Sequence, residues 1–291
     1  MKIRVPATSA NLGPGFDSCG LALSRYLTIE VIKEDTKWTV EHELGKTIPQ
    51  DEQNLLVQAA QTVAPALKPH HVKMSSSIPI ASGVGSSSSV IVAGIELANR
   101  LENLNLTERQ KIEIATSIEG HPDNCTPAIC GDFVVASYFF SENKPTVHYV
   151  KHYFPECRVI AYIPNSQVLT KESRGVLPET LSFSEAVKAS SIANVMIAAV
   201  LNGDLLLAGQ MMEQDRWHEA YREKFVPHLG TIRQIVKRNG GYAAFLSGAG
   251  PTVLVLTSEE KADLITYELE QMGGSARIEQ LSFDREGVQV F

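Results

Sequence analysis

Residues 79–89 combine the residue types that could hold a phosphate group. They read Pro-Ile-Ala-Ser-Gly-Val-Gly-Ser-Ser-Ser-Ser, so small residues dominate the segment apart from Val84. Without bulky side chains, backbone N–H groups can close around an anion. A plain Gly/Ser turn in which Ser86 only caps a helix has the same composition. The loop is not a Walker A loop, because the Gly-Lys-Ser/Thr ending is absent.

Two further loops carry glycine and polar side chains. Residues 7–17 place Asn11 and Asp17 on one tight loop, and such a pair suits the ammonium and hydroxyl groups of a small polar ligand. Residues 247–251, with Gly248, would let another backbone approach closely. A turn with local Asn and Asp hydrogen bonds, and an ordinary hairpin, are the alternatives for these two loops.

The phosphate-type loop leads into the clearest helical pattern in the chain. Apolar residues recur at helical spacing over residues 86–104. A helix N-terminus offers unpaired N–H donors and partial positive charge, so this junction suits an anion. A second helix is expected from Thr107, with Gln110 completing a capping box, to Glu119, where Gly120 favours a stop.

The remaining pattern mixes strands and helices without strict alternation, which favours an α+β fold over a doubly wound sheet. Strands are expected at residues 3–6, 27–33, 38–44, 72–76, 132–138, 158–163, 242–246, 252–256 and 276–281. Further helices are expected at residues 54–66, 184–202, 228–239 and 258–272. Residues 140–157 have a polar, irregular pattern, and we expect a domain boundary there.

Composition restricts the partners and the location of the protein. The chain has 291 residues and a net charge of -7, without a basic run, so nucleic acid is not expected as a partner. We find no signal-peptide core at the start and no apolar stretch near the ~20 residues of a membrane helix, so no membrane partner is expected. Four cysteines without a C-x-x-C pair favour reduced thiols and a cytoplasmic location: Cys19, Cys125, Cys130 and Cys157.

Together, the three loops resemble the three motifs of the GHMP kinase family, in the family's order. Val84 stands where the family's phosphate motif usually has Leu. The resemblance implies a two-domain α+β fold. Its N-terminal domain, residues 1–155, would contain a left-handed β-α-β crossover, and its C-terminal domain, residues 156–291, would be ferredoxin-like.

Four segments narrow the resemblance to the homoserine kinases of this family: residues 9–17, 119–124, 170–174 and 219–222. The implied reaction is transfer of the γ-phosphoryl group of ATP to the side-chain hydroxyl of L-homoserine, with Mg²⁺, by a homodimer. Another GHMP kinase, for mevalonate, galactose or a similar alcohol, is the first alternative. A catalytically silent relative that binds nucleotide or ligand is the second.

The resemblance also implies roles for individual residues. Nucleotide would contact Asn54 and the loop residues Pro79, Ile80, Ala81, Ser82, Gly83, Val84, Gly85, Ser86, Ser87, Ser88 and Ser89. Ser86 and Glu119 would hold the metal, with Glu113 as an alternative to Glu119. Substrate would contact Asn11, Asp17, His121, Thr170, Arg174, Arg222 and Gly248. Arg suits a planar carboxylate, although surface arginine is the plain alternative. Asp123, Asn124 and Arg174 would act in catalysis, and whether Asp123 is a base stays open.

Overall fold

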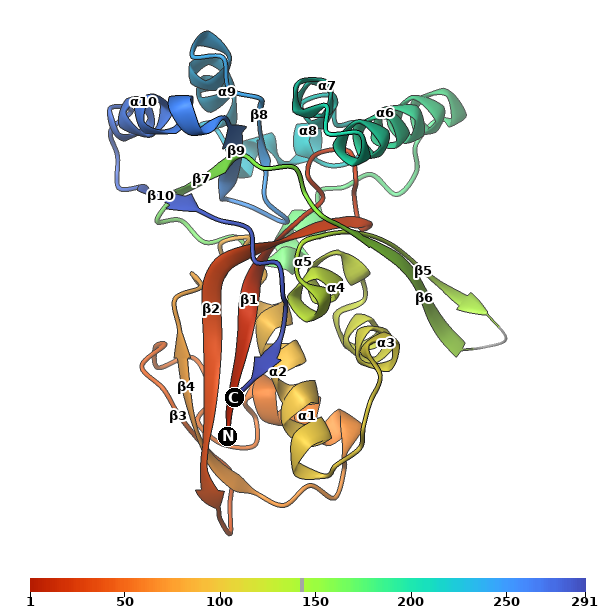
Figure 1. Cartoon of the computed structure of the whole chain (residues 1–291), viewed down its shortest axis with the longest axis vertical. Helices are drawn as coiled ribbons and strands as arrows, with labels where there is room; N and C mark the ends of the chain where they lie inside the picture. The colour runs from red at the N-terminus through yellow and green to blue at the C-terminus, as the bar shows by residue number, and fades with distance from the viewer. Residues whose placement is uncertain (142–143) are drawn as a thin grey trace.

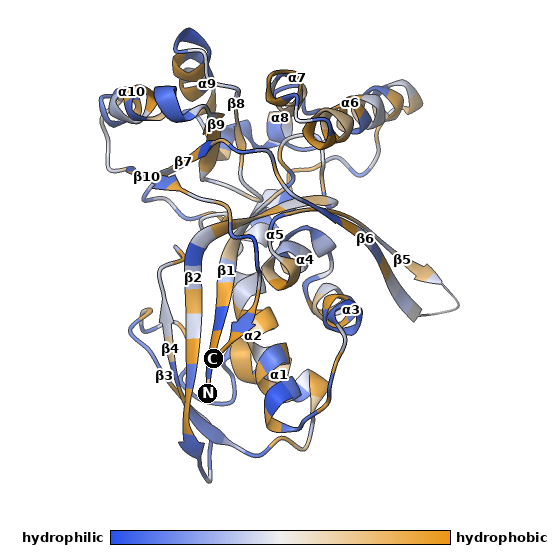
Figure 2. Ribbon diagram, viewed as in Figure 1, coloured by the Kyte–Doolittle hydropathy of each residue, from blue (hydrophilic) through white to orange (hydrophobic). Residues whose placement is uncertain are grey.

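The computed structural model describes residues 1–141 and 144–291, and their strands form two sheets. The first sheet has the order β11-β1-β2-β4-β3, with β5 pairing to β2 and to β6. Its strands are β1 (Lys2–Ala10), β2 (Cys19–Glu34), β3 (Thr39–Glu41), β4 (His70–Ser76), β5 (Phe133–Ser141), β6 (Lys144–His152) and β11 (Gln289–Val290). Hydrophobic and hydrophilic bands alternate along β1 and β2, as expected for strands with one face in a core (Figure 2).

Four helices belong to the same half of the molecule (Figure 1): α1 (Leu55–Val63), α2 (Ser86–Leu101), α3 (Glu108–Glu119) and α4 (Pro122–Cys130). Helix α2 packs against α1, α3, α4 and β1, and most of its residues are buried. This packing fixes the position of the start of α2, which is the last part of the loop of residues 79–89.

The second sheet has the order β10-β7-β9-β8, and all its neighbouring strands are antiparallel. Its strands are β7 (Arg158–Ile163), β8 (Ala243–Leu246), β9 (Val253–Thr257) and β10 (Arg277–Leu281). The helices of this half are α5 (Thr170–Arg174), α6 (Phe183–Leu201), α7 (Leu205–Met212), α8 (Glu219–Arg222), η1 (Glu223–Phe225), α9 (Leu229–Arg238) and α10 (Glu259–Glu270). With helices between β7 and β8 and between β9 and β10, the β-α-β-β-α-β sequence confirms the ferredoxin-like expectation.

Two helices predicted from the sequence begin where expected. Helix α2 begins at Ser86, and α3 follows Thr107, whose capping box with Gln110 is present. The polar, irregular pattern of residues 140–157 conceals a strand, because β6 pairs with β5 there to form a long hairpin that projects from the molecule (Figure 1), and the domain boundary expected in this segment stays a prediction. Helix α4 was not predicted, since Pro122 and Pro127 conceal it.

The N-terminal half contains a β-α-β unit, because β3 and β4 are parallel neighbours joined through α1. Its left-handed crossover stays a prediction. The two domains of residues 1–155 and 156–291 stay a proposal, which the two sheets support except at the end of the chain. Near the end of the chain, β11 returns to pair with β1 of the first sheet.

Helix α6 is a longer apolar segment than we expect from the sequence anywhere in the chain. Within the described residues it is the one helix whose length and composition would allow it to cross a membrane. The expectation that no stretch approaches that length is therefore wrong. One such helix is weak evidence for a span, because helices of water-soluble proteins pass the same test. The cytoplasmic location stays a prediction.

Candidate active site

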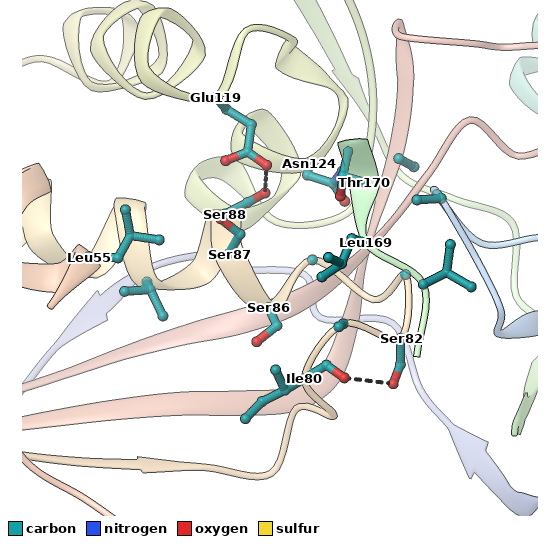
Figure 3. A pocket seen from close by; sticks show the side chains of 18 of the residues that line it. Leu55, Ile80, Ser82, Ser86, Ser87, Ser88, Glu119, Asn124, Leu169 and Thr170 are labelled. Atoms are coloured by element: carbon teal, nitrogen blue, oxygen red, sulfur yellow. Dashed lines mark hydrogen bonds between the residues drawn. The ribbon is translucent and has the colours of Figure 1, made fainter. Parts of the chain in front are cut away.

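A single pocket of about 440 Å³ collects residues from all three loops and from α5 and α8. One end, which we call the phosphate-loop end, is formed by residues 80–83 and 85–88, the last three of which begin α2. The other, the arginine end, contains Asp17, Phe16, Arg174 and Arg222. His121, Asp123 and Asn124 from the start of α4 also line the pocket. Figure 3 shows the phosphate-loop end from close by.

The phosphate-loop end presents the open N-terminus of α2. Gly85, with φ 72°, is the N-cap residue, and as a glycine it has no side chain to cap the helix. The interpretation of Ser86 as a plain cap is therefore wrong. The first turn also lacks acidic residues, so the helix dipole is unopposed there. Such an end leaves N–H donors for an anion.

Most, but not all, of the predicted phosphate-loop residues line the pocket. Ile80, Ala81, Ser82, Gly83, Gly85, Ser86, Ser87 and Ser88 do so. Val84 is buried in the hydrophobic core, which explains why an apolar residue suits that position. The Ser89 hydroxyl donates to the Ser86 carbonyl, and neither Ser89 nor Pro79 is part of the lining.

Glu119 ends α3 beside the start of α2. Its Oε1 accepts a hydrogen bond of 3.0 Å from Ser88 Oγ, which is drawn in Figure 3. Ser86, the serine predicted with Glu119, points away from it in the same view. Burial raises the pKa of Glu119, despite the opposing effects of His121 and Ser88. The alternative acid, Glu113, pairs with Arg109 and does not line the pocket.

The start of α4 places an imidazole, a carboxylate and an amide in the pocket. His121 Nδ1 lies 2.5 Å from Asp123 Oδ1, and both side chains are buried. Burial opposes a charge on His121, but the hydrogen bond and charge of Asp123 outweigh it and raise the pKa of the imidazole. Asn124 Oδ1 accepts from Thr8 Oγ1 at 2.8 Å, which fixes the orientation of the Asn124 amide.

Arg174 reaches Asp17 from α5 across the arginine end. Its Nη1 and Nη2 donate to Oδ2 and Oδ1 of Asp17 at 3.1 and 2.6 Å, a bidentate pair. Burial disfavours the charged guanidinium, but Asp17 outweighs that effect and raises the Arg174 pKa. Asn11 Oδ1 accepts from the Asp17 backbone N–H, so Asn11 positions Asp17. Thr170, at the start of α5, lines the same pocket.

Arg222 differs from Arg174 because it lacks a carboxylate partner among the ion pairs of the described residues. It is 2% exposed and donates to the carbonyl oxygens of Gly248 and Ser173 and to His218 Nδ1. Burial, together with the charge of Arg174, lowers its pKa to about 10. An anionic ligand placed between the two arginines would stabilise the charged guanidinium and so offset both effects.

Comparisons with known proteins match this arrangement. A homoserine kinase from Enterococcus faecalis is 60% identical over 291 residues and covers 100% of both chains. Residues 54–132 match the family described as GHMP kinases N terminal domain, and residues 196–274 match GHMP kinases C terminal. The chain belongs to the GHMP kinase family.

Solved structures agree with this membership. A protein from Listeria monocytogenes assigned as a homoserine kinase is 49% identical, with a TM-score of 0.89 and coverage of 100% and 98% of the two chains. A mevalonate kinase that is 18% identical, with a TM-score of 0.74 and coverage of 98% and 100%, shows the shared fold alone. The two-domain α+β fold of this GHMP kinase is the one expected from its motifs.

The arginine end of this GHMP kinase contains two residues to which the sequence assigned no role. Arg174 and Arg222 both lie over the Phe16 ring, with their Cζ atoms 5.5 and 5.4 Å from its centroid. The His218 ring stacks on the Phe16 ring with their centroids 5.2 Å apart, and His218 Nδ1 accepts a hydrogen bond from Arg222. Phe16 lies within a recognised loop, but no local signal distinguishes His218, which is brought there by folding.

Asn54 has a structural task in this GHMP kinase. It is the N-cap of α1, where its Oδ1 accepts from the Leu56 N–H and its Nδ2 donates to the Pro49 carbonyl. Asn54 also lines an apolar part of the pocket with Leu44, Ile48, Pro49, Leu55, Met74 and Val90. Apolar walls of this kind suit a flat aromatic ring.

Proposed function

We propose that this GHMP kinase transfers the γ-phosphoryl group of ATP to the side-chain hydroxyl of L-homoserine. Relatives named homoserine kinase are 53–60% identical to the chain over its full length. Phosphoryl transfer requires mainly positioning of the two substrates and neutralisation of charge. The pocket has backbone N–H groups at its phosphate-loop end and guanidinium groups at its arginine end that suit both tasks.

The burial of Arg222 beside Arg174 is the observation that supports homoserine as the substrate. A buried guanidinium beside Arg174, with its pKa lowered to about 10, favours binding of an anion. A carboxylate can accept paired N–H donors from guanidinium groups. Asp17, on the other side of Arg174, would accept from the ammonium group of an amino acid. This combination favours an α-amino acid over a sugar, which has no carboxylate.

We propose that the phosphate-loop end holds the terminal phosphates of ATP and that the apolar walls near Asn54 hold adenine. Carboxylate and hydroxyl oxygens are the ligands that Mg²⁺ prefers, so Glu119 fits a magnesium site, and the contact of Ser88 makes it a second candidate beside Ser86. When bound there, Mg²⁺ would neutralise phosphate charge. It would also offset the burial that raises the Glu119 pKa.

Asp123 could orient His121 or accept the proton of the substrate hydroxyl. The 2.5 Å contact between His121 Nδ1 and Asp123 Oδ1 supports the orienting role. The carboxylate of Asp123 is also able to accept a proton, as the second role requires. We expect the pH–rate profile of Asp123→Asn to separate them. A loss of about 10²–10⁴-fold in kcat would support a base, whereas a smaller loss with a raised KM for homoserine would support orientation.

The activity test is an ADP-release assay with L-homoserine, mevalonate and galactose as acceptors. We expect turnover with homoserine and little with the other two. Replacing Glu119 with Gln should abolish turnover, while Glu113→Gln, on the same helix, should leave it unchanged. Turnover of mevalonate or galactose in preference to homoserine would contradict the proposal, as would nucleotide binding without any turnover.

We also propose a homodimer, supported by an exposed apolar face on α6 and α7. Phe183 is 86% exposed and Leu206 60%, with Val187, Val195 and Leu201 also exposed between them. Exposed apolar patches of this size mark protein–protein contacts, and in a homodimer the same face of both copies can cover them. Light scattering should show a dimer that Val187→Glu dissociates, whereas Leu264→Glu on α10 should not. A monomeric wild-type protein would contradict this proposal.

A further inference from the structure

Ser247 connects the third glycine loop to the phosphate loop. Its hydroxyl donates to the Gly83 carbonyl at 2.7 Å and lies 2.8 Å from the Ser9 hydroxyl. A carbonyl oxygen can only accept and Ser247 has one proton, so the Ser9 hydroxyl donates to Ser247. Both serines are fully buried. Two hydroxyl groups therefore link the first, third and phosphate loops in sequence.

The carbonyl groups that follow Ser247 serve the arginine end. The Gly248 oxygen accepts from Arg222 Nη1 at 3.1 Å and from Asn11 Nδ2 at 3.2 Å. The Ala249 oxygen accepts from the hydroxyl of Ser173 at 3.0 Å, and Ser173 is the neighbour of Arg174 on α5. Residues 247–249 therefore contact Arg222, the neighbour of Arg174 and the phosphate loop.

The contact between the two loops leaves no space for adjustment. A Cβ atom on Gly83 would lie 2.3 Å from the Ser247 carbonyl oxygen and 2.8 Å from the Gly250 nitrogen. The Thr252 N–H also donates to the Ser82 carbonyl at 3.3 Å. Since the backbones are already in contact, a displacement of the third loop moves Gly83.

The bond to Ser247 also fixes the orientation of a peptide group in the phosphate loop. In a trans peptide the carbonyl and the following N–H point in opposite directions. Because Ser247 holds the Gly83 carbonyl, the Val84 N–H is directed away from the third loop. A carbonyl turned towards a phosphate would repel it, so this orientation matters for anion binding.

We propose that the third glycine loop couples the two substrate sites, with Ser247 as the positioning residue between them. Binding of an amino-acid carboxylate by Arg222 and Arg174 steadies the Gly248 and Ala249 carbonyls. Ser247 then presents an ordered phosphate loop to ATP. The first ligand orders groups that the second would otherwise have to order, which gives positive cooperativity in both directions. The inference rests on the proposed function for the identity of the two ligands.

Calorimetric titration of the full chain with a non-hydrolysable ATP analogue and Mg²⁺, with and without saturating L-homoserine, tests the proposal. We expect homoserine to tighten analogue binding about fivefold or more in the wild type, and the analogue to tighten homoserine binding by the same factor. In Ser247→Ala the factor should fall to within about twofold of one. Ser9→Ala, which keeps the Gly83 bond, should give an intermediate factor.

The coupling factor distinguishes positioning from general stability, because a merely structural defect weakens both affinities without changing their interdependence. Ser24→Ala removes a hydroxyl that accepts from the Ser282 N–H away from the pocket, and it should keep the wild-type factor. Should Ser247→Ala fail to fold, Ser9→Ala decides alone. Wild-type coupling in the serine variants, or binding of both ligands without coupling in the wild type, would overturn the inference while leaving the proposed activity intact. Absence of homoserine binding would overturn both.

Discussion

At the phosphate-loop end the donors are backbone groups at the start of α2, whereas at the arginine end they are two guanidinium groups on α5 and α8. The first set depends on glycines at positive φ and on packing of the helix, and side-chain truncation cannot remove it. The second set depends on two long side chains supported by Asp17, Phe16 and His218. Substitutions should therefore affect the two ends through different causes, and kinetics with each substrate can reveal this.

Arg222→Gln should have the largest effect at the arginine end. The variant removes the buried charge proposed to bind the substrate carboxylate, which typically costs about 3–5 kcal/mol, or about 10²–10⁴-fold in kcat/KM for homoserine. Affinity for the ATP analogue alone should change little. Arg238→Gln, on the exposed side of α9, serves as the control. Equal losses for both ligands would remove the distinction between the two ends.

Gly83→Ala should damage the phosphate-loop end for a steric reason. The new Cβ would meet the Ser247 carbonyl, and displacement of about 1 Å in a catalytic loop can lower kcat/KM about 10²-fold. Gly203→Ala is a matched control, since Gly203 also has positive φ but its Cβ would meet nothing within 4 Å. If both variants lose activity equally, backbone strain rather than the contact with Ser247 is responsible.

The helices around the pocket could be predicted from sequence much better than the contacts between them. Apolar spacing and the Thr107–Gln110 capping box identify α2 and α3 because both signals are local. Strand β6 was missed because it lies at a sheet edge beside β5 alone, and its Pro145 and mostly polar residues weaken the strand pattern. The Phe16–His218 stack joins residues from distant segments, so no spacing rule could have indicated it.

Arg174→Gln should have a smaller effect on homoserine binding than Arg222→Gln. Arg174 is more exposed than Arg222 and already paired with Asp17, so we expect about a tenfold rise in KM for homoserine, less than for Arg222→Gln. A double-mutant cycle with Asp17→Asn should show that the two effects are not additive. Additive effects would indicate that the bidentate pair seen between these side chains is absent in solution.

Phe16→Leu should have the smallest effect. The Phe16 ring orients the guanidinium groups of Arg174 and Arg222, and a loss of about 0.5–1 kcal/mol in substrate binding corresponds to a rise of about two- to fivefold in KM for homoserine, with kcat nearly unchanged. Steady-state kinetics at saturating ATP provides the measurement. A fall in kcat as large as that from Gly83→Ala would mean that Phe16 acts on the phosphate loop as well.

A crystal structure with L-homoserine, Mg²⁺ and a non-hydrolysable ATP analogue would show whether the two ends of the pocket bind ATP and homoserine as proposed. We expect the γ-phosphate against the N-terminus of α2 and the homoserine carboxylate between Arg174 and Arg222. The substrate hydroxyl should point towards the γ-phosphate near Asp123 and Asn124. A triphosphate bound elsewhere, or a carboxylate that contacts neither arginine, would contradict it.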